Sequence, residues 1–208
     1  LLLGESGTGK ELAARAILRL SGRKKGPFVA YNCADLLSSL SELQGAKRGS
    51  YTDAKQDMPG LIVGASGGVL FLDEVADTPT SVQAQLLRFL DNGEYTPRGG
   101  TTRQADIILV AATEKDIELA IANSEFRASL YNRLETCVLT LPPLRDRRED
   151  ILDLVRHLLG LAGCHRGFGP CDSERLLAGY WPGNVRQLKS VVNSAIRETK
   201  RNSLRFIV

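Results

Sequence analysis

Hydrophobic and polar positions along the chain follow two alternating patterns. Short, almost entirely apolar runs occur at residues 1–3, 28–31, 68–74, 107–113 and 138–142. Runs of this length are typical of strands, and a strand without polar alternation is expected to be buried on both faces. Stretches between these runs carry apolar residues every three or four positions, which is typical of helices. This alternation predicts an α/β fold with a parallel central sheet.

Two helices are predicted in the first part of the chain. The stretch from Glu11 to Leu20 predicts a helix whose apolar face consists of Leu12, Ala13, Ala16, Ile17 and Leu20. A later stretch predicts a helix with one face formed by Val82, Gln83, Leu86, Leu87 and Leu90. Gly93 is expected to end this second helix, because glycine readily adopts the left-handed conformation that closes helices.

The pattern changes after the Pro142-Pro143 pair. Apolar strand runs stop, helical periodicity begins at Asp150, and a cluster of arginines comes between them at Arg145, Arg147 and Arg148. The helical stripes are Ile151, Leu154, Val155, Leu158 and Leu159, and then Val185, Leu188, Val191, Val192, Ala195 and Ile196. We therefore predict an α/β core over residues 1–143 and a small helical domain over residues 144–208.

Composition narrows the class of protein. With 208 residues and 43% hydrophobic content, the chain can bury one core and a small second one. The net charge of +3, from 27 basic and 24 acidic residues, is too balanced to indicate nucleic-acid binding by charge alone. No apolar run reaches the roughly 18 residues of a membrane-spanning helix, so no membrane contact is expected. The chain starts without methionine, and we interpret it as a segment of a longer protein.

The cysteines show no paired CxxC spacing. They are Cys33, Cys137, Cys164 and Cys171. This indicates free thiols and a reducing, cytoplasmic compartment. An alternative is a zinc site formed by His157, Cys164, His165 and Cys171. Those spacings fit no familiar zinc pattern, so free thiols are the favoured interpretation.

The stretch GESGTGKE follows the first strand run and opens a helix, as a phosphate-binding loop does. Its glycines let successive N–H groups point at phosphate oxygens, and Lys10 then reaches the outer phosphates. Glu11 stands where a serine or threonine usually binds magnesium, and its carboxylate could meet the metal directly or through water. The candidate nucleotide-binding residues are Gly4, Glu5, Ser6, Gly7, Thr8, Gly9, Lys10 and Glu11.

An acidic pair ends the apolar run at 68–74. Asp73 is placed to hold magnesium, and Glu74 to polarise the attacking water. Following a phosphate loop, this pair makes magnesium-dependent ATP hydrolysis the leading hypothesis. The stretch FRASLYNR offers Arg127 and Arg133 to stabilise the transition state, and their spacing of six residues gives them different faces of a helix.

These features occur in the order typical of AAA+ ATPases, a class of P-loop NTPases with a helical lid. The finer match is with the AAA+ domain of sigma-54-dependent transcription activators, the bacterial enhancer-binding proteins. The motifs that resemble this family are GESGTGKE, NCADL (32–36), GGVLFLDE, FRASLYNRL, LPPLRDRREDI (141–151) and WPGNVRQL (181–188). The resemblance covers essentially the full chain, and Glu11 after the lysine is itself usual in the family.

The resemblance implies further roles. Asn32 would hold Glu74 in an inactive pose until the assembly is ready, and Thr113 would sense the γ-phosphate. Arg127 and Arg133 would reach into the site of an adjacent subunit, so a ring, expected to be a hexamer, would be the active species.

Arg186 would be the lid arginine that touches nucleotide, and a planar fork of donors suits phosphate. The turn formed by Trp181, Pro182 and Gly183 precedes Asn184, which is expected to cap the following helix and so aim Arg186.

The segment Gln44–Gln56 aligns with the loop by which the family contacts sigma-54 RNA polymerase holoenzyme. The family signature Gly-Ala-Phe-Thr-Gly-Ala here reads GSYTDA. Gly49, Tyr51 and Thr52 are therefore the expected contact residues. Asp53 replaces a glycine of the signature, Gln44 an apolar aromatic at the loop's base, and Glu114 the asparagine that usually follows the sensing threonine.

Two other functions stay open at this point. One is a AAA+ ATPase that remodels another protein, which the departures Asp53 and Glu114 favour. The other is a nucleotide-binding interaction module that does not hydrolyse ATP. For the Gln44–Gln56 loop alone, the alternative interpretation is a solvated basic surface loop without a partner. DNA contact would come from a helix-turn-helix that the family carries further downstream and that is not present in this chain.

Overall fold

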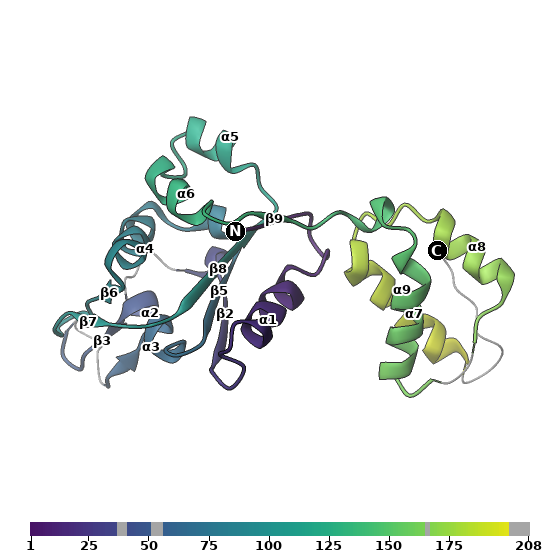
Figure 1. Cartoon of the computed structure of the whole chain (residues 1–208), viewed down its shortest axis with the longest axis horizontal. Helices are drawn as coiled ribbons and strands as arrows, with labels where there is room; N and C mark the ends of the chain where they lie inside the picture. Colours follow the sequence, from purple (N-terminus) through teal and green to yellow (C-terminus); the bar gives the residue numbers. More distant parts are fainter. Residues whose placement is uncertain (37–40, 51–55, 165–166, 200–208) are drawn as a thin grey trace. The chain divides into compact units, whose positions relative to one another are not determined.

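The structure is a computed structural model that describes residues 1–36, 41–50, 56–164 and 167–199 (Figure 1). It contains two compact units. The first consists of Leu1–Leu3 with Lys10–Thr140, and the second of Gly4–Gly9 with Leu141–Val208. Judged by its contacts, the glycine-rich loop therefore belongs to the unit that contains the C-terminal helices.

The first unit is built on a five-stranded parallel sheet, as predicted. Its strands are β1 (Leu2–Leu3), β2 (Phe28–Asn32), β5 (Val69–Asp73), β8 (Ile108–Thr113) and β9 (Leu139–Thr140). Their order is β2-β5-β8-β1-β9, and every neighbouring pair is parallel. The first four residues of β5 are at most 1% exposed, which confirms a strand buried on both faces. Because the strands are parallel, their carboxyl ends meet at one edge of the sheet.

Helices cover both faces of this sheet, with α1 on one side and α4 on the other (Figure 1). The helices are α1 (Lys10–Leu20), α2 (Ser41–Gln44), α3 (Leu61–Gly64), α4 (Thr80–Asn92), α5 (Ile117–Ala122) and α6 (Ala128–Leu134), with short 3₁₀ turns η1 (Cys33–Asp35) and η2 (Val75–Asp77). The predicted closure of α4 is confirmed, because Gly93 has φ +69° and donates its N–H to the carbonyl of Phe89.

The helix predicted at Glu11–Leu20 exists, but its predicted apolar face was wrong. Leu12 and Leu20 are 69% and 86% exposed, whereas Lys10 and Ala14 are buried. The buried side of the helix begins at Lys10, the lysine that ends the phosphate loop. This side is therefore rotated around the helix axis from the face that carries Leu12 and Leu20. Apolar spacing alone does not identify the inward face when a functional lysine occupies it.

The second unit contains the predicted helical domain. Its elements are η3 (Leu144–Asp146), α7 (Asp150–Leu161), α8 (Pro170–Ala178) and α9 (Asn184–Thr199). Both predicted stripes are confirmed, and they enclose a core of Leu144, Ile151, Val155, Leu159, Leu176, Trp181, Leu188, Val192 and Ala195. The buried Trp181 indole donates its Nε1–H to the carbonyl of Leu176, which satisfies its polar atom. The helix α8 was not predicted.

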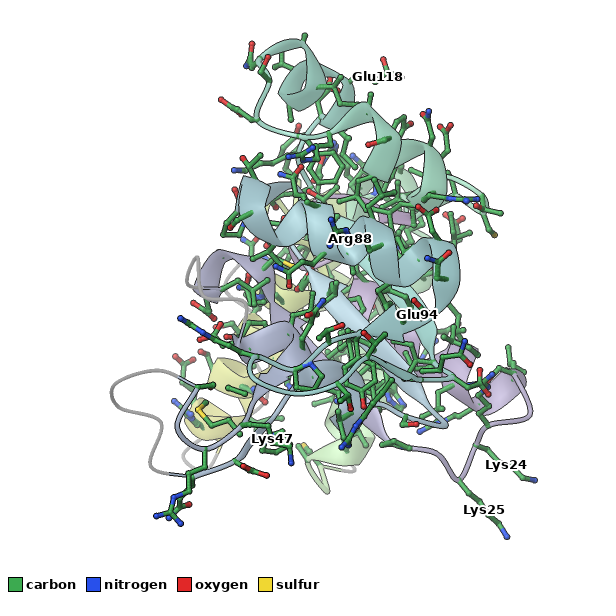
Figure 2. All side chains as sticks on the ribbon, turned by 90° about the vertical axis from the view of Figure 1, so that its left-hand side faces the viewer. Lys24, Lys25, Lys47, Arg88, Glu94 and Glu118 are labelled. Atoms are coloured by element: carbon green, nitrogen blue, oxygen red, sulfur yellow. The ribbon has the colours of Figure 1, made fainter. Side chains whose placement is uncertain are left out.

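Two small antiparallel pairs extend from the first unit. One joins β3 (Gly45–Ala46) to β4 (Met58–Pro59), and the other joins β6 (Glu94–Tyr95) to β7 (Arg103–Gln104). Figure 2 shows the second pair beginning at Glu94, directly after α4 and its Arg88, while Lys24 and Lys25 extend outward from the turn after α1.

All four cysteines are free. Among the residues that the structure describes, no three His, Cys, Asp or Glu side chains gather as a metal site, although His165 of the alternative zinc set is outside those residues. Within the same residues, no helix is long and apolar enough to span a bilayer.

Candidate functional site

The acidic pair lies at the carboxyl end of β5. The last residue of the strand is Asp73, and Glu74 follows it in the left-handed conformation with φ +52° and ψ +50°. The Glu74 N–H donates to Asp73 Oδ1 over 3.1 Å. A left-handed non-glycine residue costs on the order of 1–3 kcal/mol and is commonly found at functional sites. The turn thus holds the two carboxylates at the edge of the sheet.

Three groups surround the Glu74 carboxylate. The Thr113 hydroxyl donates to Oε2 over 3.4 Å and the Glu114 backbone N–H over 3.3 Å, while Lys10 Nζ lies 3.9 Å from Oε1. Thr113 is fully buried and Lys10 is 7% exposed. Desolvation by burial raises the pKa of Glu74, although the Glu114 amide and Lys10 act in the opposite direction. The predicted phosphate lysine, catalytic glutamate and sensing threonine therefore meet in one unit.

Asn32 lies beside this cluster, since it pairs in register with Asp73. Its Oδ1 accepts a hydrogen bond from the Ala34 N–H over 3.0 Å and so caps η1. The two hydrogen bonds to Glu74 Oε2 come from the end of β8 instead. The restraint of Glu74 by Asn32 that the family resemblance implies therefore stays a prediction for another state of the site.

Glu11 has a different partner from the one expected. Its Oε1 accepts from Arg15 Nε over 2.9 Å and from Nη2 over 2.6 Å, and its side chain is half exposed. This is the ordinary i,i+4 pairing on an outward helix face. Its role as a magnesium ligand stays a prediction.

The two candidate catalytic arginines lie at opposite ends of α6, and both are exposed. Arg127 immediately precedes the helix, and its backbone N–H donates to Gln83 Oε1 over 2.9 Å. Gln83 is fully buried, and its amide also donates to two backbone carbonyls, so this helix start is firmly positioned. Arg133 Nε donates to Asp91 Oδ1 over 2.6 Å. Arg127 thus lies outside α6 with an extended backbone, so the expectation that both arginines occupy faces of one helix was wrong, and their catalytic roles stay predictions.

In the second unit, the glycine-rich loop packs against the start of α9. Gly7 has φ +79°, and a Cβ there would lie 2.5 Å from the Gly183 carbonyl oxygen, so only glycine fits. The Val185 N–H donates to the Gly7 carbonyl over 3.0 Å. Arg186 Nη1 donates to Ser6 Oγ over 2.7 Å. The predicted lid arginine thus contacts the predicted phosphate loop.

Two arginines for which the sequence predicted no role also bind this loop. Arg147 Nη2 donates to the Thr8 carbonyl over 2.8 Å. Arg145 binds both carboxylate oxygens of Glu5, with Nη1 2.8 Å from Oε2 and Nη2 2.5 Å from Oε1. Hydrogen bonds from Arg145 are the main cause that lowers the pKa of Glu5 to about 2. The arginine cluster after Pro143 was visible in the sequence, but its partners were not.

The expectation that Asn184 caps α9 was wrong. Its Oδ1 accepts from the Leu144 N–H over 2.7 Å, and its Nδ2 donates to Glu5 Oε2 over 3.1 Å and to the Ser6 carbonyl over 2.9 Å. The side chain is fully buried, and the residue has φ +51°. It therefore joins η3 to the glycine-rich loop instead of closing its own helix.

The predicted partner loop, Gln44–Gln56, is only partly described. Its base is the β3–β4 pair, where Lys47 Nζ lies 2.8 Å from Asp57 Oδ2 and the Arg48 N–H donates to Asp57 Oδ1 over 2.8 Å. Gly49 has φ +77°. Tyr51, Thr52 and Asp53 lie outside the described residues, so their contacts stay predictions.

Family models match both parts of the chain. The "Sigma-54 interaction domain" matches residues 1–140, and the "AAA+ ATPase lid domain" matches residues 145–206. The chain belongs to the sigma-54 interaction domain family. The AAA+ fold and the family predicted from the sequence motifs are thereby confirmed.

Relatives of this family are similar over nearly the whole chain. The DNA-binding transcriptional regulator NtrC of Rhizobium meliloti (strain 1021) is 47% identical over 92% of this chain and 41% of its own length. The Nif-specific regulatory protein of Herbaspirillum seropedicae is 45% identical over 92% of this chain and 37% of its own length. The chain thus spans less than half the length of these curated relatives.

A solved structure of a relative supports the fold. The crystal structure of NtrX from Brucella abortus in complex with ATP has a TM-score of 0.85 and 35% identity, and the match covers 100% of this chain and 49% of that one. Hsp104 in a closed state, with 19% identity and a TM-score of 0.74 over 96% of this chain and 40% of that one, shares the fold alone.

Proposed function

We propose that this chain is the ATP-hydrolysing AAA+ domain of a sigma-54-dependent transcription activator. The observation that carries the proposal is the cluster of Lys10, Glu74 and Thr113 at the carboxyl edge of the sheet. Lys10 directly follows the glycine-rich loop in the sequence. The ATP complex of the NtrX relative supports ATP as the ligand.

The loop and Lys10 would bind the phosphates. The positive-φ glycines of the loop allow backbone N–H groups to turn toward an anion, and Lys10 adds a point charge from the first turn of α1. Arg186 would add a planar fork of donors, as the family resemblance implies. Thr113 would be the group that responds to the γ-phosphate.

Magnesium fits the residues at the end of β5. In ATP sites this ion takes one or two carboxylates and completes its shell with phosphate oxygens and water. Asp73 supplies one such carboxylate at the sheet edge, and Glu11 would be a second only after leaving Arg15. When bound, magnesium neutralises the charge that develops on the phosphates during hydrolysis.

Glu74 would position and deprotonate the attacking water. Burial raises its pKa, which makes the carboxylate a better proton acceptor than an exposed glutamate. The hydrogen bonds from Thr113 and Glu114 to Oε2 orient this carboxylate. A threonine that contacts both the base and the γ-phosphate can therefore couple nucleotide state to catalysis.

Assembly into a ring, which we infer to be a hexamer, would complete the site. Arg127 is exposed at a firmly positioned helix start, and it would reach the γ-phosphate of an adjacent subunit, as the family resemblance implies. The Gln44–Gln56 loop would then contact sigma-54 RNA polymerase holoenzyme through Gly49, Tyr51 and Thr52. DNA contact would belong to other parts of the full-length protein.

The test is ATP hydrolysis by the purified domain with magnesium, compared with Glu74→Gln. We expect the substitution to lower kcat by roughly 10²–10⁴-fold while ATP still binds, since it removes only the proton acceptor. Glu118→Gln, at an exposed glutamate of α5, is the matched control and should hydrolyse ATP like the parent (Figure 2). ATP binding with a kcat that Glu74→Gln leaves unchanged would contradict the proposal.

A further inference from the structure

The phosphate loop of this chain contains a carboxylate, although its proposed ligand is a polyanion. Glu5 is the second residue of the GESGTGKE stretch, and its side chain is 43% exposed. An unpaired carboxylate in this position would repel a triphosphate, because like charges within a few ångströms oppose each other. The chain therefore needs a way to neutralise or redirect Glu5.

Every oxygen of that carboxylate has a donor. Oε1 accepts from Arg145 Nη2, and Oε2 accepts from both Arg145 Nη1 and Asn184 Nδ2. The arginine fork is bidentate, which is the geometry that best neutralises a carboxylate. The Arg145 guanidinium also lies over the Tyr180 ring, 5.3 Å from its centroid, which restrains its orientation.

The same network carries the loop backbone. The Asn184 amide that donates to Glu5 also donates to the Ser6 carbonyl, and its oxygen accepts from Leu144, the neighbour of Arg145. Glu5, Arg145 and Asn184 thus form a closed set of contacts among the loop, η3 and the start of α9, all within one unit. The lid arginine is two residues beyond Asn184 in the same helix.

We propose that Arg145 is a positioning residue for nucleotide binding: it neutralises Glu5 and turns this carboxylate away from the phosphates, so that the loop is an anion site. This inference rests on the proposed function, because it presupposes that the loop binds a nucleotide. It assigns no contact between Arg145 and nucleotide. The role is electrostatic, and it makes a prediction that a simple anchoring role does not make.

The prediction concerns the order of affinities in a pair of substitutions. In Arg145→Gln the carboxylate of Glu5 stays but its neutralising partner is gone, so ADP affinity should fall roughly 10-fold or more, as expected for a lost charged hydrogen bond. Adding Glu5→Gln removes the stray charge, so the double variant should bind ADP more tightly than Arg145→Gln alone. If the pair only anchored the loop, the second substitution would leave affinity equal or weaken it further.

Salt provides a second readout. The loss of ADP affinity in Arg145→Gln should become smaller as ionic strength rises, because the Debye length falls from about 10 Å at 0.1 M to about 3 Å at 1 M. The deficit should be measured relative to the parent at each salt concentration, since phosphate binding by the parent also weakens with salt. In the ATPase assay, KM for ATP should rise while kcat stays close to that of the parent.

The experiment is a titration of the full chain with a fluorescent ADP analogue, carried out for the parent, Arg145→Gln, Glu5→Gln and the double variant. Arg156→Gln is the matched control, because it breaks the exposed Arg156–Asp153 pair of the same unit and should leave affinity unchanged. Thermal melting of each variant identifies any that fail to fold. Arg145→Lys keeps the neutralising charge, so it should retain most of the ADP affinity, and a loss of roughly tenfold in the folded Arg145→Lys variant would also overturn the electrostatic role.

The outcomes separate the two proposals. Failure of the parent itself to bind the analogue would overturn the proposed function. If the parent binds, but Arg145→Gln binds equally well, or the double variant binds no more tightly than Arg145→Gln, only the role assigned to Arg145 is overturned. Rescue by the second substitution, together with a salt-sensitive deficit, supports it.

Discussion

The Thr113 hydroxyl donates to Glu74 Oε2 over 3.4 Å, joining the ends of the neighbouring strands β8 and β5. The Thr113 oxygen also accepts from the Lys115 N–H over 3.1 Å, so it is fixed from two directions. A buried hydroxyl with both a donor and an acceptor partner has a defined orientation. The position of the candidate general base thus depends on the residue expected to sense the γ-phosphate.

Replacing Thr113 by valine should therefore impair hydrolysis more than folding. Valine has nearly the same shape, but it removes the hydroxyl that orients Glu74, and we expect kcat to fall roughly 10–100-fold. Steady-state ATPase assays and thermal melting measure the two effects. Thr140→Val, at an exposed threonine that ends β9, is the control and should change neither. An unchanged kcat in Thr113→Val would show that the contact has no role in catalysis.

The raised pKa of Glu74 predicts a pH dependence of stability. A raised pKa means that folding favours the neutral form of the Glu74 carboxyl group. Its contribution to stability is therefore present below the pKa of the unfolded state and is lost as pH rises through the pKa of the folded state. At neutral pH, Glu74→Gln should therefore melt at a higher temperature than the parent. The difference should disappear below pH 4.5, the unfolded value. Melting curves from acid to neutral pH measure this, and equal melting temperatures at neutral pH would count against it.

The lowered pKa of Glu5 predicts the opposite behaviour for the second unit. A depressed carboxyl pKa contributes stability above the unfolded value of 4.5, and that contribution is lost as pH falls toward about 2. Trp181 is the single tryptophan of the chain and is buried in this unit, so its fluorescence reports on it. Glu5→Gln should show a shallower loss of stability across this window. Identical acid titrations of the two proteins would refute the prediction.

Hydrolysis should depend on protein concentration if arginines act in trans. Specific activity should rise with protein concentration, and Arg127→Ala should lower kcat by ~10³-fold or more, as for other arginines supplied to a phosphoryl-transfer site. Mixing Arg127→Ala with Glu74→Gln should restore part of the activity. At some subunit interfaces, Glu74 of an Arg127→Ala subunit then faces Arg127 of a Glu74→Gln subunit, so that site has both residues. A flat specific activity and no restoration on mixing would exclude catalysis across subunits.

The loop signature predicts a defect in coupling. Thr52→Ala removes the hydroxyl expected to contact sigma-54, so the number of open promoter complexes formed per ATP hydrolysed should fall roughly tenfold, as expected for the loss of a well-placed hydrogen bond. Promoter opening with sigma-54 holoenzyme, measured alongside phosphate release, gives this ratio. Ser50→Ala, two residues earlier, is the comparison that distinguishes Thr52 from general damage to the loop. An unchanged ratio would show that Thr52 is not a contact.

Local patterns predicted much of this protein. The apolar run at 68–74 predicted a buried strand, and Gly93 predicted the end of α4, because both depend on residues within a few positions. The acidic pair at the end of that strand could be placed at a sheet edge for the same reason. Motifs such as GESGTGKE then led to the correct family.

The tertiary structure alone decided which polar groups are partners. Leu12 looked like a core residue by its spacing, yet the sheet packs on the side of α1 that carries Lys10 and Ala14. Glu5 and Arg145 are separated by 140 positions, and no local pattern selects one arginine of the cluster over its neighbours. Short-range periodicity records which residues prefer burial, whereas the pairing of distant charges depends on how whole elements pack, and only the folded chain determines that.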